Sequence, residues 1–195
     1  MSTRATASTK KLAKADRRAQ LLETALAIVR EEGTDALTLG RVAERAGVSK
    51  PIAYNHFQTR SGLMTTLYKD ILDRQLETLG AAIGRTPRRL DAVARVIAEA
   101  YMECTYAVGP EWHAIAAALK GDAAMEVEQH RMIESYVLFC AEALSPLSDL
   151  PKSELRRRCV GIIGAAEALS NEMVRGGYTQ DQAADDLTVL IVRYL

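Results

Sequence analysis

Side chains suited to nucleic-acid contact gather around a short turn early in the sequence. The turn, Gly47-Val48-Ser49, separates two stretches of helical character. Thr38 precedes the first stretch, where its hydroxyl can cap a helix and present the helix N-terminus to a phosphate. Lys50 opens the second stretch, where it can donate to a guanine, and Pro51 or Ile52 can contact a thymine methyl group. Two short helices around a glycine-containing turn predict a helix-turn-helix whose second helix enters the DNA major groove.

The formal net charge of zero conceals a basic N-terminal part. Residues 1–60 carry 11 lysines and arginines against 6 acidic residues, a balance of +5, which leaves 14 against 19, or −5, for the rest. Six basic residues share the first 18 positions with a single acid, Asp16: Arg4, Lys10, Lys11, Lys14, Arg17 and Arg18. Such an arm is either a solvated tail or a segment lying along a phosphate backbone. The same two interpretations apply to Arg41 and Arg45.

The composition predicts an all-helical protein. Of the 195 residues, 48% are apolar, 31 are alanine and only 5% are aromatic. Alanine, leucine, glutamate and arginine lose little entropy in helices. We expect two domains, with the helix-turn-helix in residues 1–62 and a larger helical domain in residues 63–195.

Apolar spacing and breaking residues predict about nine helices. The first four are expected over residues 10–32, over 39–46, over 50–57, and from residue 60 onward. Thr86-Pro87 and Gly121-Asp122 are expected to start later helices, and residues 146–151 to form a loop.

The last two helices are expected to form an association surface. In the first of them, apolar residues are spaced like a coiled-coil seam: Leu155, Cys159, Ile162, Ala166, Leu169 and Met173. Thr179 and Gln182 have the spacing of a capping box for the last helix. Its candidate contact residues are Leu187, Leu190, Ile191 and Tyr194.

Soft and aromatic side chains gather between residues 101 and 140, a set suited either to a plain core or to an apolar ligand cavity. The cavity candidates are Tyr101, Met102, Cys104, Tyr106, Trp112, His113, Met125, Tyr136 and Phe139. Trp112 and His113 follow the helix break at Gly109-Pro110 and are the first candidates for ligand contact.

Several classes of protein do not fit the sequence. A polar, basic N-terminus lacks the apolar core of a signal peptide, and no apolar stretch approaches the roughly 20 residues of a membrane span. We therefore expect a cytoplasmic protein without membrane contact. Three widely spaced cysteines indicate buried thiols rather than a metal site. Because phosphate loops, nucleophile elbows and His-Glu-x-x-His motifs are missing, we expect no enzyme activity, cofactor or metal. A protein-interaction module is the alternative to DNA binding.

The stretch 37–63, LTLGRVAERAGVSKPIAYNHFQTRSGL, resembles the N-terminal domain of the TetR family of bacterial transcriptional regulators. The resemblance covers roughly residues 19–72. It implies that Tyr54, Asn55 and His56 reach phosphates and bases, and that Arg60, where the family usually has a lysine, clamps a phosphate. The expected DNA contacts are therefore Thr38, Ser49, Lys50, Pro51, Ile52, Tyr54, Asn55, His56 and Arg60.

The resemblance also implies a homodimer that holds a small molecule between the helices of its larger domain. The expected partners are a palindromic double-stranded operator, a second copy of the chain and a largely apolar effector that releases the protein from DNA, as in a repressor. Gly40 and Gly62 depart from the family pattern, because each lies inside an expected helix, where glycine costs up to about 1 kcal/mol relative to alanine.

Overall fold

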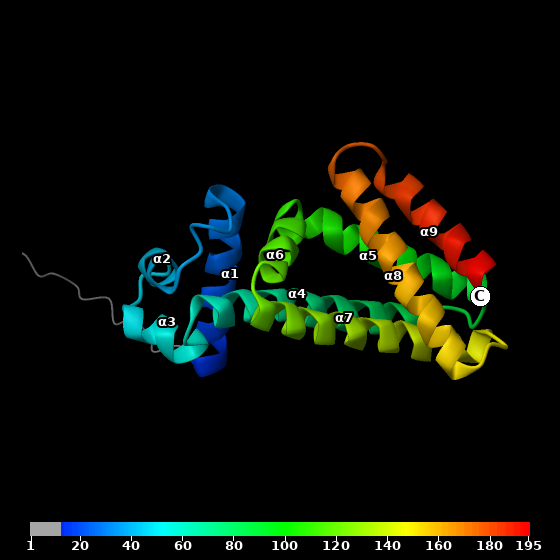
Figure 1. The fold of residues 1–195 in the computed structure, drawn as a ribbon, viewed down its shortest axis with the longest axis horizontal. Coiled ribbons are helices and arrows are strands. Elements are labelled where there is room, and N and C mark those ends of the chain that lie inside the picture. The colour runs from blue at the N-terminus through cyan, green and yellow to red at the C-terminus, as the bar shows by residue number, and fades with distance from the viewer. Residues whose placement is uncertain (1–12) are drawn as a thin grey trace, which may run out of the picture. The chain divides into compact units, whose positions relative to one another are not determined.

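The structure is a computed structural model that describes residues 13–195. Over these residues the chain forms nine α-helices, one short 3₁₀ turn and no strand (Figure 1), which confirms the all-helical prediction. The helices are α1 (Lys14–Glu32), α2 (Leu39–Arg45), α3 (Lys50–Phe57), α4 (Arg60–Ile83), α5 (Leu90–Val108), α6 (Glu111–Lys120), α7 (Ala123–Leu144), α8 (Lys152–Val174) and α9 (Gln180–Tyr194), with the 3₁₀ turn η1 (Ser145–Leu147) after α7. Arg4, Lys10 and Lys11 of the basic arm lie outside the described residues.

The chain divides into two compact units at the bond between Arg60 and Ser61. The N-terminal part, called unit 1, contains α1 to α3. The C-terminal part, called unit 2, contains α4 from Ser61 onward together with α5 to α9. This division lies two residues before the boundary expected from the sequence. The assignment of DNA binding to one unit and of dimerisation to the other stays a prediction.

Three helices begin where the sequence offers a cap. Thr38 accepts a hydrogen bond from the backbone N–H of Arg41 at 3.1 Å. Asp122 accepts from two backbone N–H groups in the first turn of α7, each at 3.0 Å. Thr179 and Gln182 form the expected capping box at the start of α9, with bonds of 2.9 and 3.2 Å. These side chains satisfy backbone donors that have no partner inside the helix, so the predicted starts of α2, α7 and α9 are confirmed.

The start of α5 differs from the prediction. The helix begins at Leu90, and not at Thr86-Pro87. The hydroxyl of Thr86 donates at 2.9 Å to the carbonyl of Ala82 in α4, so it closes the preceding helix instead of capping the next one. Arg89, in extended backbone, is the residue that precedes α5.

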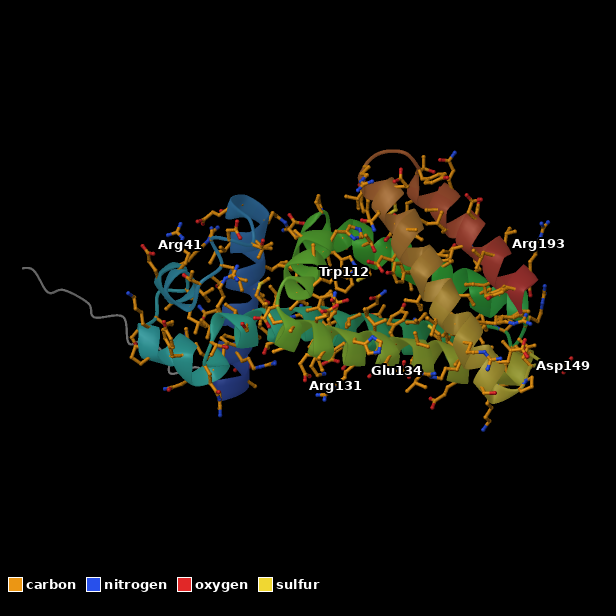
Figure 2. All side chains as sticks on the ribbon, viewed as in Figure 1. Arg41, Trp112, Arg131, Glu134, Asp149 and Arg193 are labelled. Atoms are coloured by element: carbon orange, nitrogen blue, oxygen red, sulfur yellow. The ribbon has the colours of Figure 1, made fainter. Side chains whose placement is uncertain are left out.

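Unit 2 is a helical bundle built around buried aliphatic and aromatic side chains. In Figure 1, α4 and α7 run side by side, and Gln75 of α4 donates to the hydroxyl of Tyr136 in α7 at 3.2 Å. Phe139 of α7 packs on Gly80 of α4, where a Cβ would lie 3.5 Å from the ring. Helix α5 contacts α7, α8 and α9. Trp112 is turned inward from α6 in Figure 2 and is 7% exposed, so it belongs to this interior.

The apolar seam of α8 faces the interior of its own unit. Its residues that are 7% exposed or less are Leu155, Cys159, Ile162, Ala166 and Met173. Leu169 is half-buried, and Leu187 and Ile191 of α9 are buried as well. These buried side chains have no area left for a second copy, whereas Leu169 and Leu190 are half-buried and Tyr194 is exposed, so an association surface on α8 and α9 stays a prediction. A heptad-like repeat predicts a packed helix face, but it does not determine whether the helix packed against that face belongs to the same chain or to a second copy.

Candidate nucleic-acid interface and internal cavity

Helix α3 has one buried face and one exposed face. Ala53 and Phe57 are 0% and 4% exposed and hold the helix to unit 1. Tyr54, on the opposite face, is 51% exposed. The other exposed side chains at the start of and along α3 are Ser49, Lys50, Pro51 and Asn55, whereas Ile52 and His56 are half-buried. A short helix anchored by one face with donors and an aromatic ring on the other has the form that major-groove recognition requires.

Positive charge gathers beside α3 within unit 1. Burial lowers the pKa of His56, and the positive charges of nearby α1 side chains lower it further: Lys14, Arg18 and Arg17. These three residues are the described part of the basic arm. Their positive charges therefore lie near α3, and a basic cluster of this kind favours a phosphate backbone.

Arg41 and Arg45 are both paired with glutamates of unit 1. The guanidinium of Arg41 lies 3.0 Å from Glu32 and 3.2 Å from Glu44, and that of Arg45 lies 2.5 Å from Glu31 and 3.1 Å from Glu32. The hydrogen bond from Arg41 holds the pKa of the Glu32 carboxyl below its usual value. Ion pairs this accessible to solvent add little stability. Of the two interpretations of these arginines, the structure favours a solvated, ion-paired face.

Arg60 serves the local structure of unit 1. Its guanidinium donates to the carbonyl of Leu37 at 2.9 Å and to that of Thr34 at 2.7 Å. Both acceptors lie in the connection between α1 and α2, so the side chain holds that connection in place. Because a guanidinium is a planar fork, it can hold two carbonyls at once, which a lysine cannot do in the same geometry. The phosphate contact expected of Arg60 stays a prediction.

Gly40 lies beside the most basic side chain of α3. A Cβ at Gly40 would be 3.7 Å from Cε of Lys50 and 4.0 Å from the hydroxyl of Thr38. From the sequence alone, Gly40 is only a cost to helix α2. The structure adds that this glycine leaves room for the stem of Lys50 next to the capping threonine.

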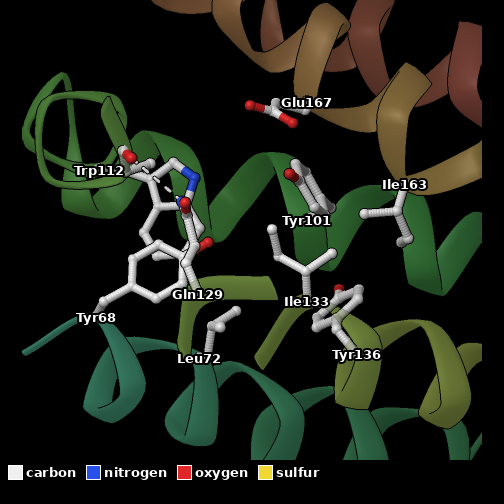
Figure 3. A pocket seen from close by; sticks show the side chains of 10 residues that line it. Tyr68, Leu72, Tyr101, Trp112, Gln129, Ile133, Tyr136, Ile163 and Glu167 are labelled. Atoms are coloured by element: carbon white, nitrogen blue, oxygen red, sulfur yellow. Dashed lines mark hydrogen bonds between the residues drawn. The ribbon is translucent and has the colours of Figure 1, made fainter. Parts of the chain in front are cut away.

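An internal cavity of about 40 Å³ lies in unit 2. Three of the sequence candidates line it: Tyr101, Trp112 and Tyr136. The remaining lining residues are Tyr68, Leu72, Ala116, Gln129, Ile133, Ile163 and Glu167. Figure 3 shows these side chains converging from α4, α5, α6, α7 and α8, with Trp112 over Tyr68 at one side of the cavity and Glu167 beside Tyr101.

The other sequence candidates do not line this cavity. Met102 is fully buried in the core, Met125 is 6% exposed, and Tyr106 is 71% exposed and therefore faces solvent. Phe139 packs on Gly80, and Cys104 is half-buried. His113 is half-buried, and its Nε2 atom is buried without a hydrogen-bond partner among the described residues. Burial lowers the pKa of His113.

Aromatic contacts and internal hydrogen bonds hold the cavity wall. The rings of Tyr68 and Trp112 stack with centroids 4.7 Å apart and planes 11° apart, and Tyr101 meets Tyr136 edge to face at 6.1 Å. Gln129 donates to the carbonyl of Ala116 at 3.2 Å. Burial raises the pKa of Tyr68 to about 12. The wall is therefore aromatic, with its amides already paired.

Seven of the ten lining residues were not predicted from the sequence, and they come from α4, α6, α7 and α8. One signal was present: Gln129, Ile133 and Tyr136 recur at helical spacing, and a glutamine on an apolar stripe needs a partner when it is buried. Gln129 is 3% exposed. No comparable signal marks Glu167, since a single glutamate in a helix is ordinarily solvated.

The remaining chemistry of the described residues is limited. Burial raises the pKa of the Cys140 and Cys159 thiols, and it raises the pKa of Cys104 to about 11, so all three are poor nucleophiles. Within residues 13–195, histidines, cysteines and carboxylates form no group of three that could hold a metal ion. No helix of this described part has the length and apolar character to cross a membrane.

Residues 21–67 match the family model of the bacterial regulatory proteins of the tetR family. This N-terminal segment carries the signature of the TetR family. The matched residues include α2 and α3, so the family signature falls on the helix-turn-helix. Members of the family are regulatory proteins.

Known proteins resemble the chain to different extents. The HTH-type transcriptional regulator BetI of Brucella anthropi is 30% identical over 82 residues, which are 42% of each chain, so the match spans about two fifths of that relative. BetI of Paraburkholderia phymatum is 29% identical over 175 residues, 85% of this chain and 83% of its own.

Two solved structures share the fold. One is a TetR-like transcriptional regulator from Rhodococcus sp. RHA1, with a TM-score of 0.71, 20% identity, and coverage of 94% of this chain and 97% of its own. The other is the transcriptional regulator FadR from Bacillus subtilis in complex with stearoyl-CoA, with a TM-score of 0.73, 14% identity, and coverage of 91% and 98%.

Replacing Thr38 by alanine is expected to lower the free energy of unfolding by about 1 kcal/mol, because the N–H of Arg41 loses its acceptor. A urea titration followed by far-UV circular dichroism measures the change. Thr78→Ala is the matched control: Thr78 is exposed within α4 and only donates to the carbonyl of Arg74, so we expect its effect to stay within about 0.5 kcal/mol. Equal losses in both variants would contradict the capping role.

Proposed function

We propose that the protein is a DNA-binding transcriptional regulator, a repressor that a small molecule releases from its operator. The observation that carries the proposal is the exposed face of α3, with Lys50, Tyr54 and Asn55 in solvent, inside the segment that matches the family model. Thr38 and Ser49 add hydroxyls at the starts of the two helices. In this proposal the protein works in the cytoplasm, where DNA is, and needs neither catalysis nor a cofactor.

A homodimer on a palindromic operator is part of the proposal. Exposed apolar and small residues on α8 and α9 support it: Val160, Gly164, Ala168, Val189 and Val192. Val160 and Val189 are 51% and 50% exposed. Apolar side chains gathered on the outer faces of adjacent helices are typical of association surfaces. These residues replace the buried seam as the proposed dimer contacts, together with Tyr194, which is 46% exposed.

The proposed release mechanism uses the cavity in unit 2. Two recognition helices must enter major grooves about 34 Å apart, or a multiple of that distance. A ligand that binds one spacing of the DNA-binding units better than another shifts the population toward the spacing it prefers. Helix α4 begins at Arg60 and contributes Tyr68 and Leu72 to the cavity wall, so it links the cavity to the helix-turn-helix through continuous chain. The aromatic wall supports an effector that is largely apolar.

Selection of bound sequences from a random duplex pool tests the proposal. We expect a palindromic sequence to be enriched and to bind at least about a thousandfold more tightly than scrambled DNA at the same salt concentration. Affinity for both duplexes is expected to fall as salt rises, because phosphate contacts release counterions.

The selection uses protein unfolded, dialysed and refolded to remove any bound small molecule, with circular dichroism to check its fold. Failure of this refolded protein to enrich any sequence would contradict DNA binding and favour the protein-interaction alternative. Enrichment of a site without symmetry would retain DNA binding but contradict the palindromic operator.

A further inference from the structure

The side chain of Lys50 lies along the first turn of helix α2, although the residue itself begins helix α3. A Cβ on Gly40 would be 3.7 Å from Cε of Lys50, which is ordinary van der Waals contact. Helices α2 and α3 contact each other (Figure 1), and Gly40 has no side chain to fill this place. The end of the Lys50 stem therefore occupies the space that a side chain at position 40 would need.

The hydroxyl of Thr38 lies beside the same point. Its Oγ1 atom would be 4.0 Å from the Cβ on Gly40. Oγ1 accepts from the N–H of Arg41 at 3.1 Å, and the hydroxyl keeps its own proton for a further acceptor. The side chains of Thr38 and Lys50 are both exposed. A hydroxyl and an ammonium group thus lie close together in solvent, where one anion can accept from both.

The charge of Lys50 is not neutralised by the described residues of unit 1. Arg41 and Arg45 of α2 are each paired with glutamates. Over residues 13–195, by contrast, Lys50 takes part in no ion pair. An unpaired ammonium beside a hydroxyl attracts an anion, and the anion that a DNA-binding protein meets is the phosphate of the backbone.

We propose that Lys50 binds a DNA phosphate together with Thr38, in a position that the missing side chain of Gly40 permits, so that Lys50 contributes affinity and not base recognition. This inference rests on the proposed function and names the role of one residue of its interface. The sequence alone predicts a guanine donor, because Lys50 opens the recognition helix. A stem that lies over α2 instead places the ammonium near the start of that helix. Base edges are then left to other exposed side chains of α3, such as Asn55, whose amide can pair with an adenine.

Lys50→Met tests the proposal, because methionine removes the ammonium and keeps an unbranched stem. Fluorescence anisotropy measures binding of the full-length protein to the selected operator and to scrambled duplex over a series of salt concentrations. Loss of a phosphate contact should weaken binding to both duplexes by a similar factor, about tenfold or more. The slope of log affinity against log salt should shrink by about 1 for each copy of the chain bound. The operator-to-scrambled ratio should stay within about threefold, and a second selection with the variant should return the same sequence.

Gly40→Leu tests the role of the glycine. Leucine fills the place of the Lys50 stem and moves the ammonium away, so this variant should lose the same affinity and the same slope as Lys50→Met. The double variant should bind no more than about twofold more weakly than Lys50→Met alone, since both changes remove one contact. A purely structural effect of the leucine would leave the slope unchanged. Circular dichroism checks that each variant is folded, and Lys50→Met decides by itself if Gly40→Leu does not fold.

Lys69→Met is the matched control for the loss of one positive charge. Lys69 is exposed in α4, pairs with Asp73 at 2.6 Å and belongs to unit 2. Its replacement should change neither the affinity nor the salt slope. A slope reduced as much in Lys69→Met as in Lys50→Met would assign the effect to net charge and overturn the proposal.

Two results with Lys50→Met also overturn the proposal. One is a loss confined to the operator, with the operator-to-scrambled ratio lowered by about tenfold or more and the slope unchanged, which would assign Lys50 to a base. The other is an unchanged affinity for both duplexes. Fully additive losses in the double variant would exclude Gly40 from the proposed role. Failure of the unmodified protein to enrich any sequence rejects the proposed function, whereas enrichment with an unchanged slope in Lys50→Met rejects this inference alone.

Discussion

Tyr54→Ala is expected to weaken operator binding by about tenfold to a hundredfold, while the protein stays folded and its oligomeric state stays the same. The ring is 51% exposed on α3, so its removal opens no cavity in the core. Losing one specific DNA contact of this kind costs about 1 to 3 kcal/mol. Fluorescence anisotropy with the selected operator at one fixed salt concentration measures the loss, and sedimentation confirms the unchanged assembly.

Two further variants show where the effect of Tyr54 originates. Tyr54→Phe keeps the ring and removes the hydroxyl, so an intermediate loss assigns part of the binding to a hydrogen bond. Tyr178→Ala is the matched control, because Tyr178 is 39% exposed but belongs to unit 2, and its affinity for the operator should stay within twofold of the unmodified protein. An unchanged affinity in Tyr54→Ala would exclude the tyrosine from the interface.

The helix-turn-helix could be predicted from the sequence because its helix cap and its turn depend on interactions between residues that are close together in the chain. Thr38 caps α2 through a residue three positions away, and the short turn after α2 brings α3 into contact with it. The same holds for Asp122 and for Thr179 with Gln182. Thr86 lies between two helices, and the local sequence does not determine which of them its hydroxyl will bond. In the structure the hydroxyl donates to the carbonyl of Ala82 in the preceding helix.

The cavity could be predicted only in part, because it depends on contacts between distant segments. Tyr101, Trp112 and Tyr136 were identifiable as aromatic candidates in one stretch of sequence. Tyr68 and Glu167 come from α4 and α8, far away along the chain. The α8 seam shows the same limit: the spacing of Leu155 and Cys159 predicts a packed face, and only the tertiary structure shows that the face packs inside its own chain.

Gly164→Glu is expected to convert the proposed dimer into monomers. Gly164 is exposed on α8, and a Cβ there would have no atom within 4 Å, so the new side chain fits the folded monomer. Glutamate also favours helix more than glycine does, and loss of association is therefore not a consequence of unfolding. In a symmetric interface the charge would be buried twice without a partner, which is strongly unfavourable. Sedimentation equilibrium should give 21.3 kDa in place of twice that mass.

Operator binding should fall together with dimerisation in Gly164→Glu. Two linked recognition helices bind a palindrome with an effective concentration that separate monomers lack, so we expect a loss of about a hundredfold or more at low protein concentration. Gly164→Ala is the matched control, because it adds a methyl group without charge and should retain both the dimer and the operator affinity. A Gly164→Glu protein that remains dimeric would place the interface on another surface. A monomeric Gly164→Glu protein with full operator affinity would instead contradict recognition by a pair of α3 helices.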